Sequence, residues 1–175
     1  LRYFDKFKYQ SLYDFLKKLD NKFSSDWIAQ HPPTERIERM NLVTRAIEVA
    51  TSPDMLFADP CFNIDKAPFM RNIEVEVYGR RFTRYLLIKL DFIFHNPDQR
   101  MNLESLSVEH ILPQNPGANS QWRKGFTDAE RGKLVDLLGN LVLITAKKNS
   151  AQGNVDFALK KTKYFASKID TCPNS

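Results

Sequence analysis

Two short apolar segments in the second half of the chain constrain its fold most. They read SVEHIL at 107–112 and NLVLIT at 140–145, and each has the length and composition of a β-strand. Pro113 ends the first segment, and Gly139 precedes the second. Because helical spacing of apolar residues prevails elsewhere, the sequence predicts a mainly α protein of the α+β class with a small β motif.

Four other segments predict helices, namely 11–23, 34–50, 81–94 and 156–169, although 81–94 could also form a buried strand. Residues 51–68 contain three prolines and predict a loop, and 73–78 alternate like a short strand or begin the next element. A long polar connection around Trp122 is expected over 115–133, followed by a helical turn at 133–138. We therefore expect a helical subdomain over 1–100 and a second domain over 101–175.

The charge and the cysteines limit the class of protein. A formal net charge of +5 is compatible with a polyanionic partner without requiring one. Cys61 and Cys172 are far apart in the sequence and form no CxxC pair, so we expect neither a zinc site nor a disulfide framework. Because disulfides are rare in the cytosol, we expect a cytoplasmic protein. No apolar segment is long enough to span a membrane. Since the chain begins without Met, we expect it to be a piece of a longer protein.

Three polar positions around the predicted strands are candidates for chemistry. The first is the pair Glu109-His110, in which a carboxylate able to bind a hard cation adjoins a side chain able to take a proton from water. Asn140 opens the second strand, and Asn149 lies nine residues further on, near an expected helix start. Each has an ordinary alternative: a half-buried strand histidine, a turn residue and a helix cap.

Taken together, these segments resemble a known family. SVEHILPQ, GNLVLIT, KKNSAQGN and F-x-x-K-K-x-x-Y, spread over 107–165, are similar to HNH-like (His-Me finger) nuclease domains with the His-x-x-Pro signature. Such domains form the C-terminal part of GmrSD-type modification-dependent restriction enzymes and of SspE-like phage-defence proteins. The resemblance implies a ββα-metal fold, and it implies that a nucleotide-hydrolysing sensor domain precedes this fragment.

The resemblance also implies roles for individual residues. His110 would be the general base, and Asn140 would orient the loop after the strand or hold His110. Glu109 and Asn149 would bind a divalent metal, Mg²⁺ or else Mn²⁺. The family often has Asp in place of Glu109 and His in place of Asn149.

Lysines near the motif predict contacts with nucleic acid. Lys148, Lys160 and Lys161 are the candidates for phosphate binding, and a solvated helix face is the alternative. The leading hypothesis is a metal-dependent endonuclease or nickase acting on double-stranded DNA, modified DNA included, in restriction or antiviral defence. A noncatalytic DNA-binding or protein-interaction module is the second hypothesis, and a ribonuclease is the third.

Overall fold

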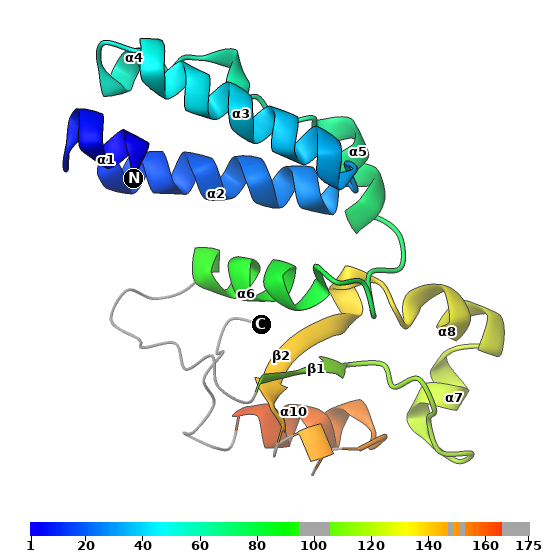
Figure 1. The fold of residues 1–175 in the computed structure, drawn as a ribbon. Coiled ribbons are helices and arrows are strands. Elements are labelled where there is room, and N and C mark those ends of the chain that lie inside the picture. Colours follow the sequence, from blue (N-terminus) through cyan, green and yellow to red (C-terminus); the bar gives the residue numbers. More distant parts are fainter. Residues whose placement is uncertain (95–105, 147–148, 151–152, 166–175) are drawn as a thin grey trace. The chain divides into compact units, whose positions relative to one another are not determined.

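The computed structural model describes residues 1–94, 106–146, 149–150 and 153–165. The chain divides into two compact units, Leu1–Ile73 and Glu74–Ser175 (Figure 1). Helices dominate both, and the sheet found in the described residues has two antiparallel strands, which confirms the mainly α, α+β class. Within the described ranges, every helix is too short or too polar to cross a lipid bilayer.

The first unit is built from helices. The predicted helices at 11–23 and 34–50 are confirmed as α2 (Leu12–Ile28) and α3 (Pro33–Val49). The expected loop at 51–68 instead contains α4 (Pro53–Phe57) and the 3-10 turn η1 (Pro60–Phe62). Both begin with proline, which the first turn of a helix tolerates because its N–H groups need no partner within the helix. The remaining helices of this unit are α1 (Arg2–Phe7) and α5 (Lys66–Ile73).

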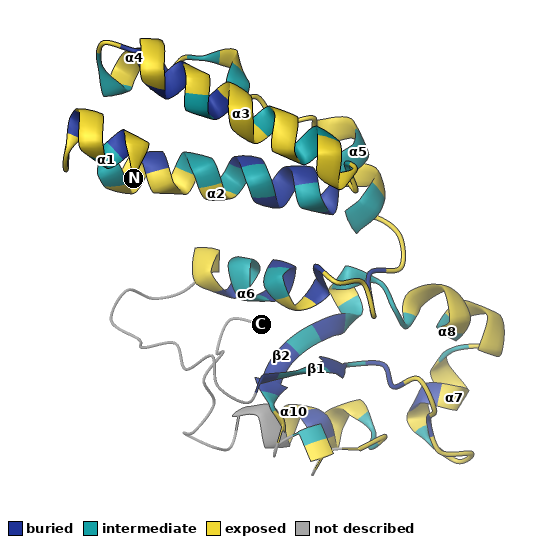
Figure 2. Ribbon diagram, viewed as in Figure 1, coloured by how far each residue is buried: buried dark blue, intermediate teal, exposed yellow. Residues whose placement is uncertain are grey.

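Aromatic and aliphatic side chains from α1 to η1 form the core of the first unit. The rings of Tyr3 and Phe15 stack with centroids 4.0 Å apart, which joins α1 to α2. Leu56 of α4 is completely buried in the same cluster. Figure 2 shows the buried positions of α2 and α3. The cluster comprises Tyr3, Phe7, Phe15, Val43, Ala46, Ile47, Ala50, Leu56 and Phe62.

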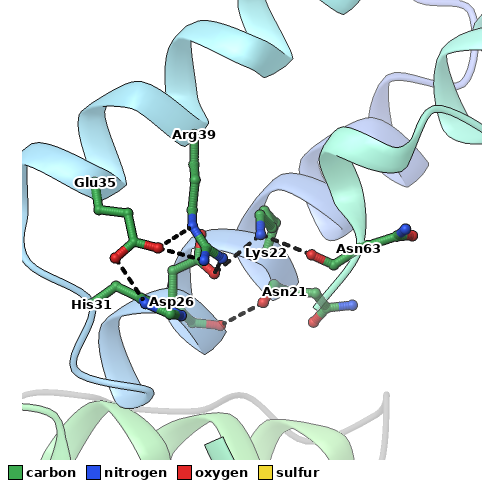
Figure 3. Close-up of polar contacts among 8 residues, drawn as sticks. Asn21, Lys22, Asp26, His31, Glu35, Arg39 and Asn63 are labelled. Carbon is green, nitrogen blue, oxygen red and sulfur yellow. Dashed lines mark hydrogen bonds and ion pairs between the residues drawn. The ribbon is translucent and has the colours of Figure 1, made fainter. Parts of the chain in front are cut away.

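A buried polar network joins α2 to α3 at the other end of the helix pair (Figure 3). The Asp26 carboxylate accepts hydrogen bonds from Lys22 Nζ at 3.1 Å and from Arg39 Nη1 at 2.9 Å. Arg39 also donates to Glu35 Oε1, and Lys22 donates to the carbonyl of Asn63. Asp26 is 1% exposed, so its buried carboxylate pairs with Lys22 and shares Arg39 with Glu35.

Acid should weaken this network through Glu35. The hydrogen bond from Arg39 holds the pKa of Glu35 below its ordinary value of 4.5. A carboxyl group with a lowered pKa stabilises the fold above its unfolded pKa, and this contribution is lost as the pH falls through the lowered value. Glu35→Gln should therefore lower the melting temperature at neutral pH, and the difference from wild type should shrink well below pH 4.5. A difference independent of pH would contradict this account.

The second unit contains the predicted strands. They are β1 (Leu106–His110) and β2 (Leu141–Thr145), paired antiparallel with His110 opposite Leu141 and Leu106 opposite Thr145. Helix α6 (Thr83–Phe94) confirms the helix expected at 81–94 and packs against β2. The boundary between the two units lies after Ile73, whereas the sequence predicts a domain boundary at 100.

The segment before α6 does not form the short strand considered for it. Ile73 ends α5, and Glu76 makes a single antiparallel bridge with Leu137. Val77 is completely buried. This short segment therefore lies against the connection between the two strands.

Half of the connection between β1 and β2 is helical. It contains α7 (Gln121–Gly125), α8 (Asp128–Leu134) and the 3-10 turn η2 (Leu138–Asn140). Trp122 is buried, and its Nε1 donates to the carbonyl of Val155 at 3.0 Å. Val155 lies just before Asp156 and α10 (Phe157–Phe165), the last helix in the described residues, so α7 helps to place α10 next to the sheet (Figure 1).

Candidate active site at the end of β1

His110 is the last residue of β1, and the turn after it is fixed by Asn140. The Asn140 backbone carbonyl accepts from Ile111 N–H at 2.9 Å. Its side-chain oxygen accepts from Leu112 N–H at 2.7 Å, and its Nδ2 donates to the carbonyls of Leu112 (3.0 Å) and Val135 (2.7 Å). Of the two roles expected for Asn140, the structure shows the one in which it orients the loop.

The imidazole of His110 lies against a carboxylate. Its Nε2 is 3.0 Å from Asp136 Oδ1, and Gln114 Nε2 donates to the same oxygen at 3.1 Å. An ionised carboxylate only accepts hydrogen bonds, so Nε2 must carry the proton in this pair. Nδ1 is then the basic nitrogen of the neutral ring, the form that can take a proton from water.

Hydrogen bonds also fix the backbone of Asp136. Its carbonyl accepts hydrogen bonds from the N–H groups of Val77 at 2.9 Å and Tyr78 at 3.2 Å. The Tyr78 ring also packs edge-on against the His110 ring, with centroids 4.3 Å apart. The segment before α6 therefore supports both members of the His110–Asp136 pair.

Sequence reasoning missed Asp136. The signal available was a single carboxylate inside the apolar run Leu134–Leu138, four residues before Asn140. An acidic residue among apolar neighbours is unusual in a packed segment and often has a specific partner. The identity of that partner, 26 positions earlier in the chain, comes from the fold alone.

Glu109 and Lys160 form a buried ion pair beside His110. Lys160 Nζ lies 2.6 Å from Glu109 Oε1 and donates to the carbonyl of His110, also at 2.6 Å. Their side chains are 9% and 1% exposed, respectively. Lys160 therefore does not lie on the surface where a phosphate would contact it, contrary to the expectation from sequence.

The other two candidate lysines differ from Lys160. Lys161 is exposed on α10, where the chain could meet a phosphate, and its role in binding stays a prediction. Lys148 lies outside the described residues.

Asn149 is placed near the other end of β1. Its Nδ2 donates to Ser107 Oγ at 2.7 Å and to the carbonyl of Val108 at 3.1 Å. These bonds tie the segment after β2 to the body of β1. The site thus contains the His110–Asp136 pair, while Asn140 and Asn149 both bind backbone.

The expected metal ligands do not fit a metal ion in this arrangement. A divalent cation lies about 2.0–2.6 Å from a carboxylate oxygen that binds it. The Lys160 ammonium already occupies such a position, because its Nζ lies 2.6 Å from Glu109 Oε1. Among the described residues, no group of three His, Cys, Asp or Glu side chains could hold a metal. Dependence on a divalent metal therefore stays a prediction drawn from the resemblance.

Comparison with known proteins identifies the family. The sequence profile described as "GmrSD restriction endonucleases, C-terminal domain" matches residues 65–171, which is more than half of the chain and includes both strands. Comparisons with curated proteins and with solved structures gave no match. The matched region contains the His110–Asp136 pair and the buried Glu109–Lys160 pair. The chain therefore belongs to the family of GmrSD restriction endonuclease C-terminal domains, a nuclease-related family.

Proposed function

We propose that this domain hydrolyses phosphodiester bonds in DNA, with His110 as the general base. The observation that supports it best is the hydrogen bond between His110 Nε2 and Asp136 Oδ1, which orients the ring and makes Nδ1 the basic nitrogen. Membership of a restriction endonuclease family supports DNA as the substrate. The HNH-type mechanism itself comes from the resemblance of SVEHILPQ and GNLVLIT to that class.

In the proposed reaction, His110 acts on the attacking water. Nδ1 takes a proton from a water molecule while the water oxygen forms a bond to phosphorus. The bond from phosphorus to the 3′ oxygen breaks, and this oxygen takes a proton from solvent. The products are a 5′-phosphate and a 3′-hydroxyl. Asp136 stabilises the imidazolium that forms, because its negative charge lies 3.0 Å from the ring.

The wider biological role is part of the same proposal. We infer a function in restriction or phage defence, with double-stranded DNA, modified DNA included, as the target. A preceding nucleotide-hydrolysing domain would sense the target, and cutting of one strand would make the domain a nickase. Lys161, exposed next to the buried Lys160, would contact the DNA backbone.

The test is conversion of supercoiled plasmid to nicked or linear DNA. Parallel reactions contain Mg²⁺, Mn²⁺ or EDTA, and use plasmid from cells with and without DNA modification. Cleavage only with metal would support metal dependence, and equal cleavage in EDTA would refute it. Cleavage of a matched RNA substrate in place of DNA would favour the ribonuclease hypothesis. DNA binding without cleavage under every condition would favour the noncatalytic module.

Asp136→Asn should lower the cleavage rate by about a hundredfold with little loss of stability. The asparagine amide can donate to Nε2, which would move the ring proton to Nδ1 and remove the base. The rate is measured in the plasmid assay, with unfolding in urea alongside. Gln114→Ala is the matched control, because Gln114 contacts the same oxygen from an exposed position. It should change the rate about twofold at most. An Asp136→Asn variant as active as wild type would refute this role.

A further inference from the structure

We propose that Lys160 is a positioning residue for His110, and that Glu109 is the counter-ion of Lys160 and not a metal ligand. This inference deepens the proposed function and rests on it for its effect on cleavage. Its structural half can be tested without DNA.

Burial is the first reason to assign Lys160 a defined task. The residue is 0% exposed, and lysine is almost never completely buried unless it is paired. Its ammonium group has three N–H donors, two of which are placed on Glu109 Oε1 and on the His110 carbonyl at 2.6 Å each. A buried lysine with two such acceptors is held in one position.

The second reason is where these bonds act on the strand. Adjacent residues of a strand direct their side chains to opposite faces, so the Glu109 carboxylate and the His110 ring lie on different sides of β1. Lys160 binds the Glu109 side chain and the His110 carbonyl, and so anchors the backbone that carries His110. Asp136 holds the ring on the other side. The place of the ring therefore depends on an anchor from α10 as well as on its own hydrogen bond.

The third reason concerns charge. The Glu109 carboxylate is already neutralised by Lys160 within a region that excludes water. A divalent ion at Glu109 would have to displace the ammonium, which would then be left buried beside the His110 carbonyl without the Glu109 carboxylate. An unpaired buried charge is strongly unfavourable. The geometry therefore favours the ion pair over a metal at Glu109.

The test compares Lys160→Met with the double variant Glu109→Gln/Lys160→Met. The single variant leaves Glu109 buried without its counter-ion, so we expect a large drop in the urea midpoint. The double variant removes both charges, and we expect most of that loss to be recovered. Lys161→Met, the exposed neighbour, is the control and should leave the urea midpoint unchanged. A Lys160→Met variant as stable as wild type would overturn the proposal.

The recovered double variant separates positioning from simple stabilisation. The ring N–H signals are measured by NMR in protein with isotope-labelled histidine. The signals of His110 are assigned by their absence in His110→Gln. We expect the hydrogen-bonded Nε2–H signal present in wild type and in Lys161→Met to be lost in the double variant, and cleavage to fall about tenfold or more. Wild-type ring signals and wild-type cleavage in a stable double variant would overturn the positioning role. A wild-type protein that cuts no DNA would refute the proposed function, while the ring signals would still decide this inference.

A metal titration tests the role of Glu109. Mn²⁺ binding is measured by calorimetry for wild type and Glu109→Gln. We expect equal binding, or none to either protein, because Glu109 is committed to Lys160. A loss of about tenfold or more in the variant would overturn the counter-ion assignment.

Discussion

The His110→Ala variant should nick plasmid DNA about a hundred to ten thousand times more slowly than wild type. The reason is the loss of the side chain that we propose takes a proton from the attacking water. Asp136 would remain, but with the ring gone its carboxylate has no Nε2–H to orient. The measurement is the initial rate of nicking under the conditions in which the wild type is most active.

The control for this variant is folding, because the ring of His110 packs against Tyr78. His110→Gln keeps more of the side-chain volume, and it should be as inactive as the alanine variant while unfolding nearer the wild-type urea concentration. DNA affinity should stay close to wild type in both variants. A folded His110→Gln that cuts at the wild-type rate would remove His110 from the mechanism.

Asp26→Ala should lower the free energy of unfolding by about 3–5 kcal/mol. The aspartate balances both Lys22 and Arg39, and the Lys22 side chain is 4% exposed. Removing it leaves Lys22 buried with its hydrogen bond to the Asn63 carbonyl but without the Asp26 carboxylate. The measurement is unfolding of the whole chain in urea, followed by circular dichroism.

Two further variants are compared with Asp26→Ala. Asp26→Asn retains an oxygen acceptor without the charge, so it should destabilise less than alanine. Asp14, exposed on the same helix, provides the matched control, and Asp14→Ala should cost about 1 kcal/mol or less. A loss for Asp26→Ala as small as that of Asp14→Ala would show that the network contributes little.

The elements that could be predicted are those with a periodic apolar pattern. Such a pattern identified α2, α3, α6 and both strands, because burial of one face leaves a regular trace in the sequence. The sequence does not predict α4 and η1, because prolines favour a loop. Pro53 and Pro60 instead each stand at a helix start, capped by Ser52 or Asp59.

The candidate site was less predictable than the fold. His110 and Asn140 stand in short motifs, so they could be found by resemblance and by their position next to a strand. Asp136 could not be paired with His110, because a contact across 26 positions depends on how the connection folds. Lys160 is expected on the surface because most lysines lie there, and a sequence pattern alone does not show which lysine meets a buried carboxylate.

The side chains of Asn149 and Lys160 have a further consequence for β1. Ile111 bonds to Asn140 in the ladder, so the alternate residues Val108 and His110 direct their carbonyls away from β2. The Asn149 side chain donates a hydrogen bond to the Val108 carbonyl, and the Lys160 side chain donates one to the His110 carbonyl. An open strand edge invites pairing with a strand of another molecule. These two side chains occupy the acceptors that such a strand would need, so the two-stranded sheet of the described residues is shielded from self-association through β1.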